Sequence, residues 1–182
     1  MHSKKNFFEN FFKYSNLYAR ENGEITLFEY SSNRNLYADE VFFVGENNNI
    51  LSLSDLDSKK ALILLWVTWN IESIDAIKKL DKLALDAKRN NIKEIDIFPI
   101  MVTKSEEEFV KSIREINEIY NLNIIRNLNK YADIQGKLQT YFETYNLPIL
   151  IVWNGSKNFF ILDLQKIDIN NISIIDFFED FK

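Results

Sequence analysis

The 182-residue sequence contains no cysteine. Disulfide formation, thiol exchange and thiolate peroxidase chemistry all need a sulfur nucleophile, so any sulfur would have to come from a partner. Zinc sites and iron-sulfur clusters held by cysteine are excluded within the chain for the same reason. The only histidine is His2, next to the N-terminus, where it is a poor metal ligand and a poor base for a catalytic serine. We therefore expect no catalytic residue, no metal and no cofactor.

Glycine and proline are scarce, with four and two residues, whereas 46% of the residues are hydrophobic and 14% are aromatic. This composition is typical of an ordered globular chain and not of a linker. The longest apolar run, 61–67, is far shorter than the roughly 18 residues that a membrane-spanning helix needs. Basic residues are not in excess either, and the net charge of −5 argues against a nucleic acid partner, because phosphate binding needs a cluster of lysine and arginine.

No repeat and no linker rich in proline, glycine or serine marks a domain boundary. A chain of this length buries one sizeable core. We expect a single domain in which residues 1–20 form an N-terminal helix and residues 21–182 form the main fold. We expect the protein to be cytoplasmic if Met1 is the native start, and periplasmic or anchored to a membrane if an upstream signal or anchor has been removed.

Apolar spacing predicts a mixture of helices and strands. The spacing over 4–19 predicts an amphipathic helix whose phenylalanine face docks on the core. The continuous apolar run 61–68 predicts a strand buried on both faces, as in the centre of a sheet covered by helices. A tight turn and a long helix over 71–89 follow it, with apolar residues at helical spacing.

A second helix, over 105–120, opens with Ser105 and Glu108 at the spacing of a capping box. Before it, 94–103 predicts another central strand, which Pro99 weakens because proline cannot donate to a ladder. The other predicted strands are 25–30, 40–45, 123–126, 146–153 and, after a turn at Asn154-Gly155, an antiparallel return over 158–164, while 47–53 predicts a turn followed by a short extended piece. The other predicted helices are 134–145 and 172–181.

This order of elements resembles the thioredoxin fold with a helix and a strand inserted near the middle, as in TlpA-like thiol:disulfide oxidoreductases and other redoxins. The stretch "LSLSDLDSKKALILLWVTWN" is similar to that family's "sLsdlkGK" turn and "lvnFWATWC" strand, with Trp66, Thr68 and Trp69 on the motif. The stretch "NLPILIVWNGSKNF" is similar to "glPttflId.dGkiv", with Pro148 on the proline that is cis in the family. The resemblance implies an α/β three-layer fold, a central mixed sheet flanked by helices, with an N-terminal helix and hairpin and a central helix-strand insertion.

The departures from the family fall on its chemistry. The resemblance places Asn70 and Ser73 at the two active-site cysteines, and Leu64 at the buried acid that thioredoxins keep as a proton relay. Asparagine is a favoured N-cap residue, so we expect Asn70 to cap the following helix, with Glu72 adding a favourable charge in its first turn. Where the family has a reactive cysteine at the start of this helix, the chain is therefore expected to have a capped helix N-terminus.

These departures predict a redox-inactive domain that binds a protein or peptide through the former active-site groove. The residues that the resemblance assigns to the groove are Trp69, Asn70, Ile71, Glu72, Ser73, Leu147 and Pro148. Main-chain groups beside a cis Pro148 are expected to be free for an extended peptide. Trp69 fits either an exposed binding platform or a packing remnant. The alternatives are an enzyme with residual oxidoreductase or peroxidase-like activity that depends on an external thiol, and a structural subunit whose first helix is the interface.

Overall fold

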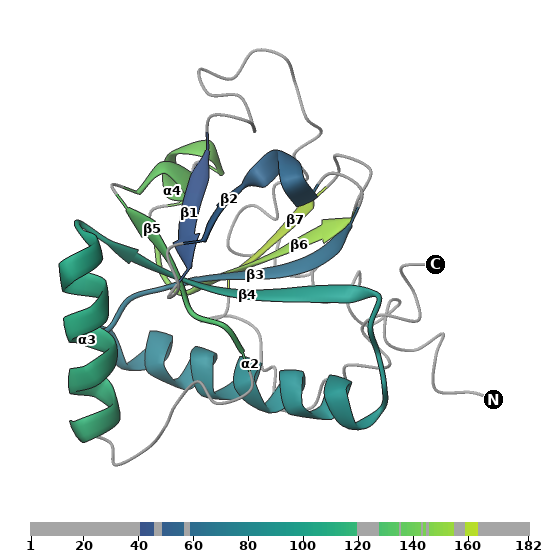
Figure 1. The fold of residues 1–182 in the computed structure, drawn as a ribbon, viewed down its shortest axis with the longest axis horizontal. Helices are drawn as coiled ribbons and strands as arrows, with labels where there is room; N and C mark the ends of the chain where they lie inside the picture. The colour runs from purple at the N-terminus through teal and green to yellow at the C-terminus, as the bar shows by residue number, and fades with distance from the viewer. Residues whose placement is uncertain are drawn as a thin grey trace, which may run out of the picture.

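Seven strands form one mixed sheet in the part of the chain that the computed structural model describes, which is residues 41–45, 49–56, 59–119, 128–134, 136–142, 144, 146–154 and 159–163 (Figure 1). Across the sheet they lie in the order β2 (Ile50–Ser52), β1 (Phe42–Gly45), β5 (Tyr131–Ile134), β4 (Ile95–Thr103), β3 (Lys60–Trp66), β6 (Ile149–Asn154) and β7 (Phe159–Asp163). The pairs β3–β4 and β4–β5 are parallel, and the other four neighbouring pairs are antiparallel.

Helices cover both faces of this sheet, which gives three layers (Figure 1). On one face, α2 (Ile71–Arg89) and α3 (Glu106–Ile119) share a hydrophobic cluster with the sheet. On the other face, the short 3-10 helix η2 (Leu53–Leu56) and α4 (Lys137–Tyr141) belong to a second cluster. No described helix is long and apolar enough to cross a membrane.

The central strand β3 is buried on both faces, as its continuous apolar run predicts. Leu62 and Leu64 belong to the cluster under α2, whereas Ile63 and Leu65 belong to the opposite cluster. Each of these four side chains is at most 1% exposed. Neighbouring strands β4 and β6 cover the two edges of β3, so neither its faces nor its edges reach solvent.

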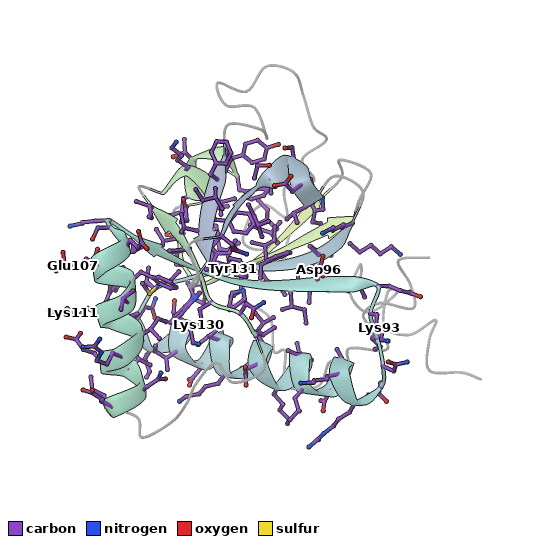
Figure 2. All side chains as sticks on the ribbon, in the orientation of Figure 1. Lys93, Asp96, Glu107, Lys111, Lys130 and Tyr131 are labelled. Carbon is purple, nitrogen blue, oxygen red and sulfur yellow. The ribbon has the colours of Figure 1, made fainter. Side chains whose placement is uncertain are left out.

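The second cluster is rich in aromatic rings. Phe43 of β1, Phe98 of β4 and Tyr131 of β5 form a triangle of edge-to-face contacts, with ring centroids 5.3 to 5.6 Å apart. Edge-to-face packing is the favoured geometry for aromatic pairs. Figure 2 shows Tyr131 amid the side chains at the sheet, whereas Glu107 and Lys111 lie on the outer side of α3. The three rings tie the hairpin of β1 and β2 to the parallel part of the sheet.

The two long helices lie where the sequence places them. Helix α2 spans Ile71–Arg89, the predicted range. Helix α3 spans Glu106–Ile119 in the described part of the chain and begins one residue later than predicted. Half of the predicted capping box forms, since the Glu108 N–H donates to Ser105 Oγ over 3.1 Å. The Glu108 carboxylate accepts hydrogen bonds from the Lys104 N–H and from Thr103 Oγ1, and these bonds hold the pKa of the Glu108 carboxyl below its usual value.

Pro99 does not interrupt β4. The strand pairs with β3 along Ile95–Met101, but its ladder with β5 begins only at Ile100. The missing proline N–H therefore falls just before the second ladder starts, where β4 has a paired neighbour on one side only. The predicted strand 94–103 is confirmed.

In the region that follows α3, one strand is not predicted and one predicted helix is wrong in its limits. Strand β5 covers 131–134, a segment for which the sequence predicts no strand. Helix α4 covers only 137–141 of the predicted 134–145, because Gly136 has a φ of 67° in the left-handed region, and no helix can run through that conformation. The inserted helix and strand are α3 and β5, which lie between β4 and α4 in the chain.

Several predictions lie outside the described residues. These are the helices at 4–19 and 172–181, the strands at 25–30 and 123–126, and the Asn154-Gly155 turn as a whole. The antiparallel return after that turn is confirmed, because β7 pairs with β6 in antiparallel register from Trp153–Phe159 to Ile149–Asp163.

Candidate functional site

The start of α2 and the turn before β6 meet at one end of the sheet. Strand β3 ends at Trp66 and α2 begins at Ile71. Strand β6 runs antiparallel to β3, with Ile149 opposite Leu65, so the residues that precede β6 lie beside the end of β3. The fold therefore brings the segment 69–73 next to Leu147 and Pro148, although the two are far apart in the sequence.

Asn70 joins these two segments through one side chain. Its Oδ1 accepts a hydrogen bond of 2.8 Å from the Glu72 N–H, and its Nδ2 donates a hydrogen bond of 2.9 Å to the Leu147 carbonyl. The backbone at Asn70 is extended, with φ −109° and ψ 122°, as an N-cap residue requires. The predicted cap is confirmed, and the bond to Leu147 adds a cross-link that the sequence does not indicate.

The peptide bond between Leu147 and Pro148 is cis, as the resemblance implies. The expectation that the main-chain groups beside Pro148 are free is wrong for the Leu147 carbonyl, which accepts the hydrogen bond from Asn70. From Ile149 onward, β6 has β3 on one side and β7 on the other, so neither edge of that strand is open.

Trp69 and Ile71 point into solvent on either side of Asn70. Trp69 is 82% exposed and Ile71 is 61% exposed, whereas Trp66 at the end of β3 is only 1% exposed. An aromatic ring with so little contact does not fill a core, so the interpretation of Trp69 as a packing remnant is wrong. Glu72 is also exposed and Asn70 is half-buried.

Three of the predicted groove residues lie beneath this surface. Ser73 is completely buried, because the third position of the helix turns toward the sheet, and its Oγ has no hydrogen-bond partner among the described residues. Leu147 is 9% exposed and Pro148 is buried. The exposed side of the site, here named the Trp69 surface, therefore consists of Trp69, Asn70, Ile71 and Glu72.

The most perturbed acid in the described region, Asp133, is absent from the sequence prediction. It is completely buried at the end of β5, and its carboxylate accepts hydrogen bonds of 2.9 Å from the N–H groups of Lys137 and Leu138. Burial raises the pKa of Asp133 to about 6, although these hydrogen bonds oppose the shift. Gly136 has no side chain to cap α4, so Asp133 caps it from three residues earlier.

The described residues contain no group of three His, Asp or Glu side chains placed to hold a metal. The Asp133 carboxylate itself has two main-chain donors and faces the first turn of α4. Its geometry is that of a structural cap. The only signal in the sequence is an acid ahead of the glycine in "ADIQGK", which is too common a pattern to identify a buried carboxylate.

Comparison with protein-family models gives no match, and comparison with curated proteins gives none either. Solved structures do match. A putative thiol-disulfide oxidoreductase from Bacteroides vulgatus has a TM-score of 0.58 at 16% identity, over 81% of this chain and 98% of its own. MTB dsbF has a TM-score of 0.55 at 13% identity, over 69% of this chain and 84% of its own.

A third similar structure is a secreted disulfide oxidoreductase from Mycobacterium tuberculosis, homologous to E. coli DsbE, with a TM-score of 0.53 at 12% identity over 77% of this chain and 92% of its own. At these identities the likeness concerns the fold. The three-layer arrangement, the helix that follows the central strand and the cis proline that faces its start are all present here. The chain therefore has the thioredoxin-like fold of the thiol-disulfide oxidoreductases, and it carries that fold without a single cysteine.

Proposed function

We propose that this chain is a redox-inactive thioredoxin-like domain that binds a protein or peptide partner through the Trp69 surface. The observation that carries the proposal is the 82% exposure of Trp69, beside Ile71 at 61%. An aromatic side chain buries about 150–250 Å² when it is covered, which corresponds to roughly 4 to 6 kcal/mol before the costs of association are subtracted. A partner that covers both side chains gains enough apolar contact for specific binding.

The other two tryptophans make this exposure informative. Trp66 and Trp153 are each 1% exposed, and Trp153 also donates its Nε1–H to the Leu56 carbonyl over 2.8 Å. The fold therefore buries two of the three tryptophans, and Trp69 is the one that it leaves exposed. Tryptophan is also among the residues most often found at the energetic centre of an interface, which supports Trp69 as the anchor.

The first turn of α2 supports binding over chemistry. Asn70 is held by two hydrogen bonds, and the hydroxyl of Ser73 is completely buried. A nucleophile needs an accessible atom and a neighbouring base, and neither residue has both. We therefore place the enzyme that depends on an external thiol second, as the alternative that an activity assay must exclude.

An extracytoplasmic place for the chain forms part of this proposal. One similar structure is described as secreted, and another, with a TM-score of 0.50 at 19% identity over 65% of this chain and 83% of its own, as an exposed lipoprotein thioredoxin from Streptococcus pneumoniae. Its test is the location of the full-length native protein in fractionated source cells.

The proposal is tested by quantitative capture from native lysate with three immobilised proteins: the wild type, Trp69→Ala and Ile119→Ala. Ile119 is a matched control, since it is 74% exposed and lies at the end of α3. We expect a partner that the wild type and Ile119→Ala retain and that Trp69→Ala loses at least tenfold. Both substitutions remove exposed side chains and should change the free energy of unfolding by less than about 0.5 kcal/mol. Equal capture by all three proteins would mean that the Trp69 surface is not the interface.

A further inference from the structure

The hairpin of β1 and β2 is apolar on both of its faces. Phe43 points into the aromatic cluster of the core. Phe42 and Val44 alternate with it along β1 and therefore lie on the opposite face, where Ile50 of β2 stands directly across from Val44. Phe42 is 44% exposed, Ile50 is 65% exposed and Val44 is half-buried. We name these three side chains the hairpin face.

The composition of the hairpin face indicates that something covers it. An antiparallel strand with one face in water normally alternates between apolar and polar residues, whereas strands that are apolar on both faces are covered on both. On its other side, Val44 stands opposite Ala132 of β5, which is buried in the cluster that α2 and α3 share with the sheet. The hairpin face thus continues the side of the sheet on which these helices pack. The described part of the chain leaves it exposed, so its cover comes from residues outside that part or from another molecule.

We propose that the apolar side of residues 4–19 covers the hairpin face of the same chain. These residues lie outside the described part, and their sequence carries phenylalanine at positions 7, 8, 11 and 12, the spacing of one face of a helix. Amphipathic helices owe most of their stability to the packing of such a face. Packing this face against Phe42, Val44 and Ile50 removes apolar surface of both partners from water.

The place of this segment in the chain favours the hairpin face. Residues 20–41 link it directly to β1, which starts at Phe42, and Phe42 is itself part of the face. A flexible linker of this length spans roughly 25 Å, close to the diameter of a small domain. The linker therefore reaches the hairpin face and holds the segment near it at an effective concentration on the order of millimolar. A separate molecule would have to compete with this contact.

Paramagnetic labelling tests the proposal in the full chain. Because the sequence contains no cysteine, Ser15→Cys supplies a single thiol for a nitroxide and removes none of the phenylalanines. We expect the nitroxide to broaden the amide signals of Val44 and Ile50 at least threefold more than those of Trp69 and Ile119. In an equal mixture of spin-labelled chain and isotope-labelled chain without a nitroxide, this broadening should disappear, because the contact is within one molecule.

Substitutions check the contact from both sides. Phe8→Ser together with Phe12→Ser, and separately Ile50→Ser, should each reduce the broadening at Val44 at least twofold. Ile119→Ser should leave it unchanged, and it is a matched control because Ile119 is 74% exposed at the end of α3.

Urea unfolding measures the same contact without a label. Ile50→Ser should lower the urea midpoint at least twice as much in the otherwise unchanged chain as in the chain that carries Phe8→Ser and Phe12→Ser. Substitutions of residues in contact are not additive, whereas those of distant residues are. The shift caused by Ile119→Ser should therefore be the same in both chains. Equal shifts for Ile50→Ser in the two chains would contradict the proposal.

The other outcomes of the labelling also overturn it, each for a different reason. Stronger broadening at Trp69 and Ile71 than at the hairpin face would place the segment over the Trp69 surface. Weak and even broadening throughout the chain would mean that the segment covers no face, and the first helix would again be a candidate interface with another molecule. Broadening that persists in the mixture would mean that the segment of one chain covers the hairpin of a second copy.

Discussion

Asp133 and Leu138 are both completely buried, and the Asp133 carboxylate accepts the Leu138 N–H over 2.9 Å. The same carboxylate accepts the Lys137 N–H, so one acid supplies the cap that Gly136 cannot give to α4. A charged group in such a place is costly because it has left water. The two main-chain donors reduce that cost without removing it, which is why the pKa of Asp133 is raised to about 6.

The first prediction concerns the pH dependence of stability. An ordinary aspartate has a pKa of 3.8, so between about pH 4 and pH 6 the folded chain keeps a proton on Asp133 that the unfolded chain has released. The stability that this residue contributes is therefore present at acidic pH and is lost as the pH rises to about 6. The shift corresponds to roughly 3 kcal/mol.

We expect the free energy of unfolding of wild type, relative to that of Asp133→Asn, to fall by about 2 to 3 kcal/mol between pH 4 and pH 7. Urea unfolding at closely spaced pH values measures it. Ile151→Val is the control, because it removes one buried methyl group and no titrating group, so its cost of about 1 kcal/mol should be the same at every pH. A flat difference between wild type and Asp133→Asn would contradict the raised pKa.

Much of the fold follows from local patterns. The run around Leu64 predicts a strand buried on both faces, and α2 and α3 follow from apolar spacing and from the caps at Asn70 and Ser105. These signals are strong because each depends on neighbours in the sequence. The sequence does not predict strand β5, because its pattern "YADI" is short and its partners β1 and β4 come from distant parts of the chain.

The site was predictable to a similar degree. The family resemblance identifies the segment 69–73 and Pro148, and the capping role of Asn70 follows from its residue type. The donor role of Asn70 toward Leu147 does not, because it depends on how two distant segments meet in space. The burial of Ser73 also depends on the rotation of α2 against the sheet, which a single helical turn of sequence does not determine.

The second prediction separates the two bonds of Asn70. Asn70→Ala removes the cap, for about 1 kcal/mol, and also leaves the Leu147 carbonyl without its donor, for about 1 kcal/mol more. Asn70→Ser keeps the cap and should cost only the second part. Urea unfolding at pH 7 should therefore give about 2 kcal/mol for the first variant and about 1 kcal/mol for the second. Equal losses in the two variants would mean that the bond to Leu147 contributes nothing.

The third prediction concerns Ser73. Its hydroxyl is buried and has no partner among the described residues, so Ser73→Ala removes a group that folding has taken from water without replacement. We expect the variant to be between neutral and about 1 kcal/mol more stable than wild type. Ser105→Ala is the matched control, because that hydroxyl caps α3 and its loss should cost about 1 kcal/mol. A clear loss of stability in Ser73→Ala would reveal a partner for its hydroxyl.

The last prediction concerns the missing chemistry. We expect wild type to reduce insulin with dithiothreitol no faster than buffer, because the chain has no thiol. The double variant Asn70→Cys with Ser73→Cys should gain turnover. A thiolate at position 70 would lie beside the Glu72 N–H at the start of a 19-residue helix, and this position lowers the pKa of the thiol. The second sulfur, at position 73, would be buried, as Ser73 is.

Turnover by this double variant should stay slow, since Leu64 is apolar and completely buried where a proton relay is needed. The two single cysteine variants are the controls, because one thiol cannot form the internal disulfide that releases product. Equal inactivity of the double and single variants would show that positions 70 and 73 lack the geometry for a disulfide. Wild-type turnover that Ser73→Ala abolishes would contradict redox inactivity itself, and it would make the enzyme the better account of this fold.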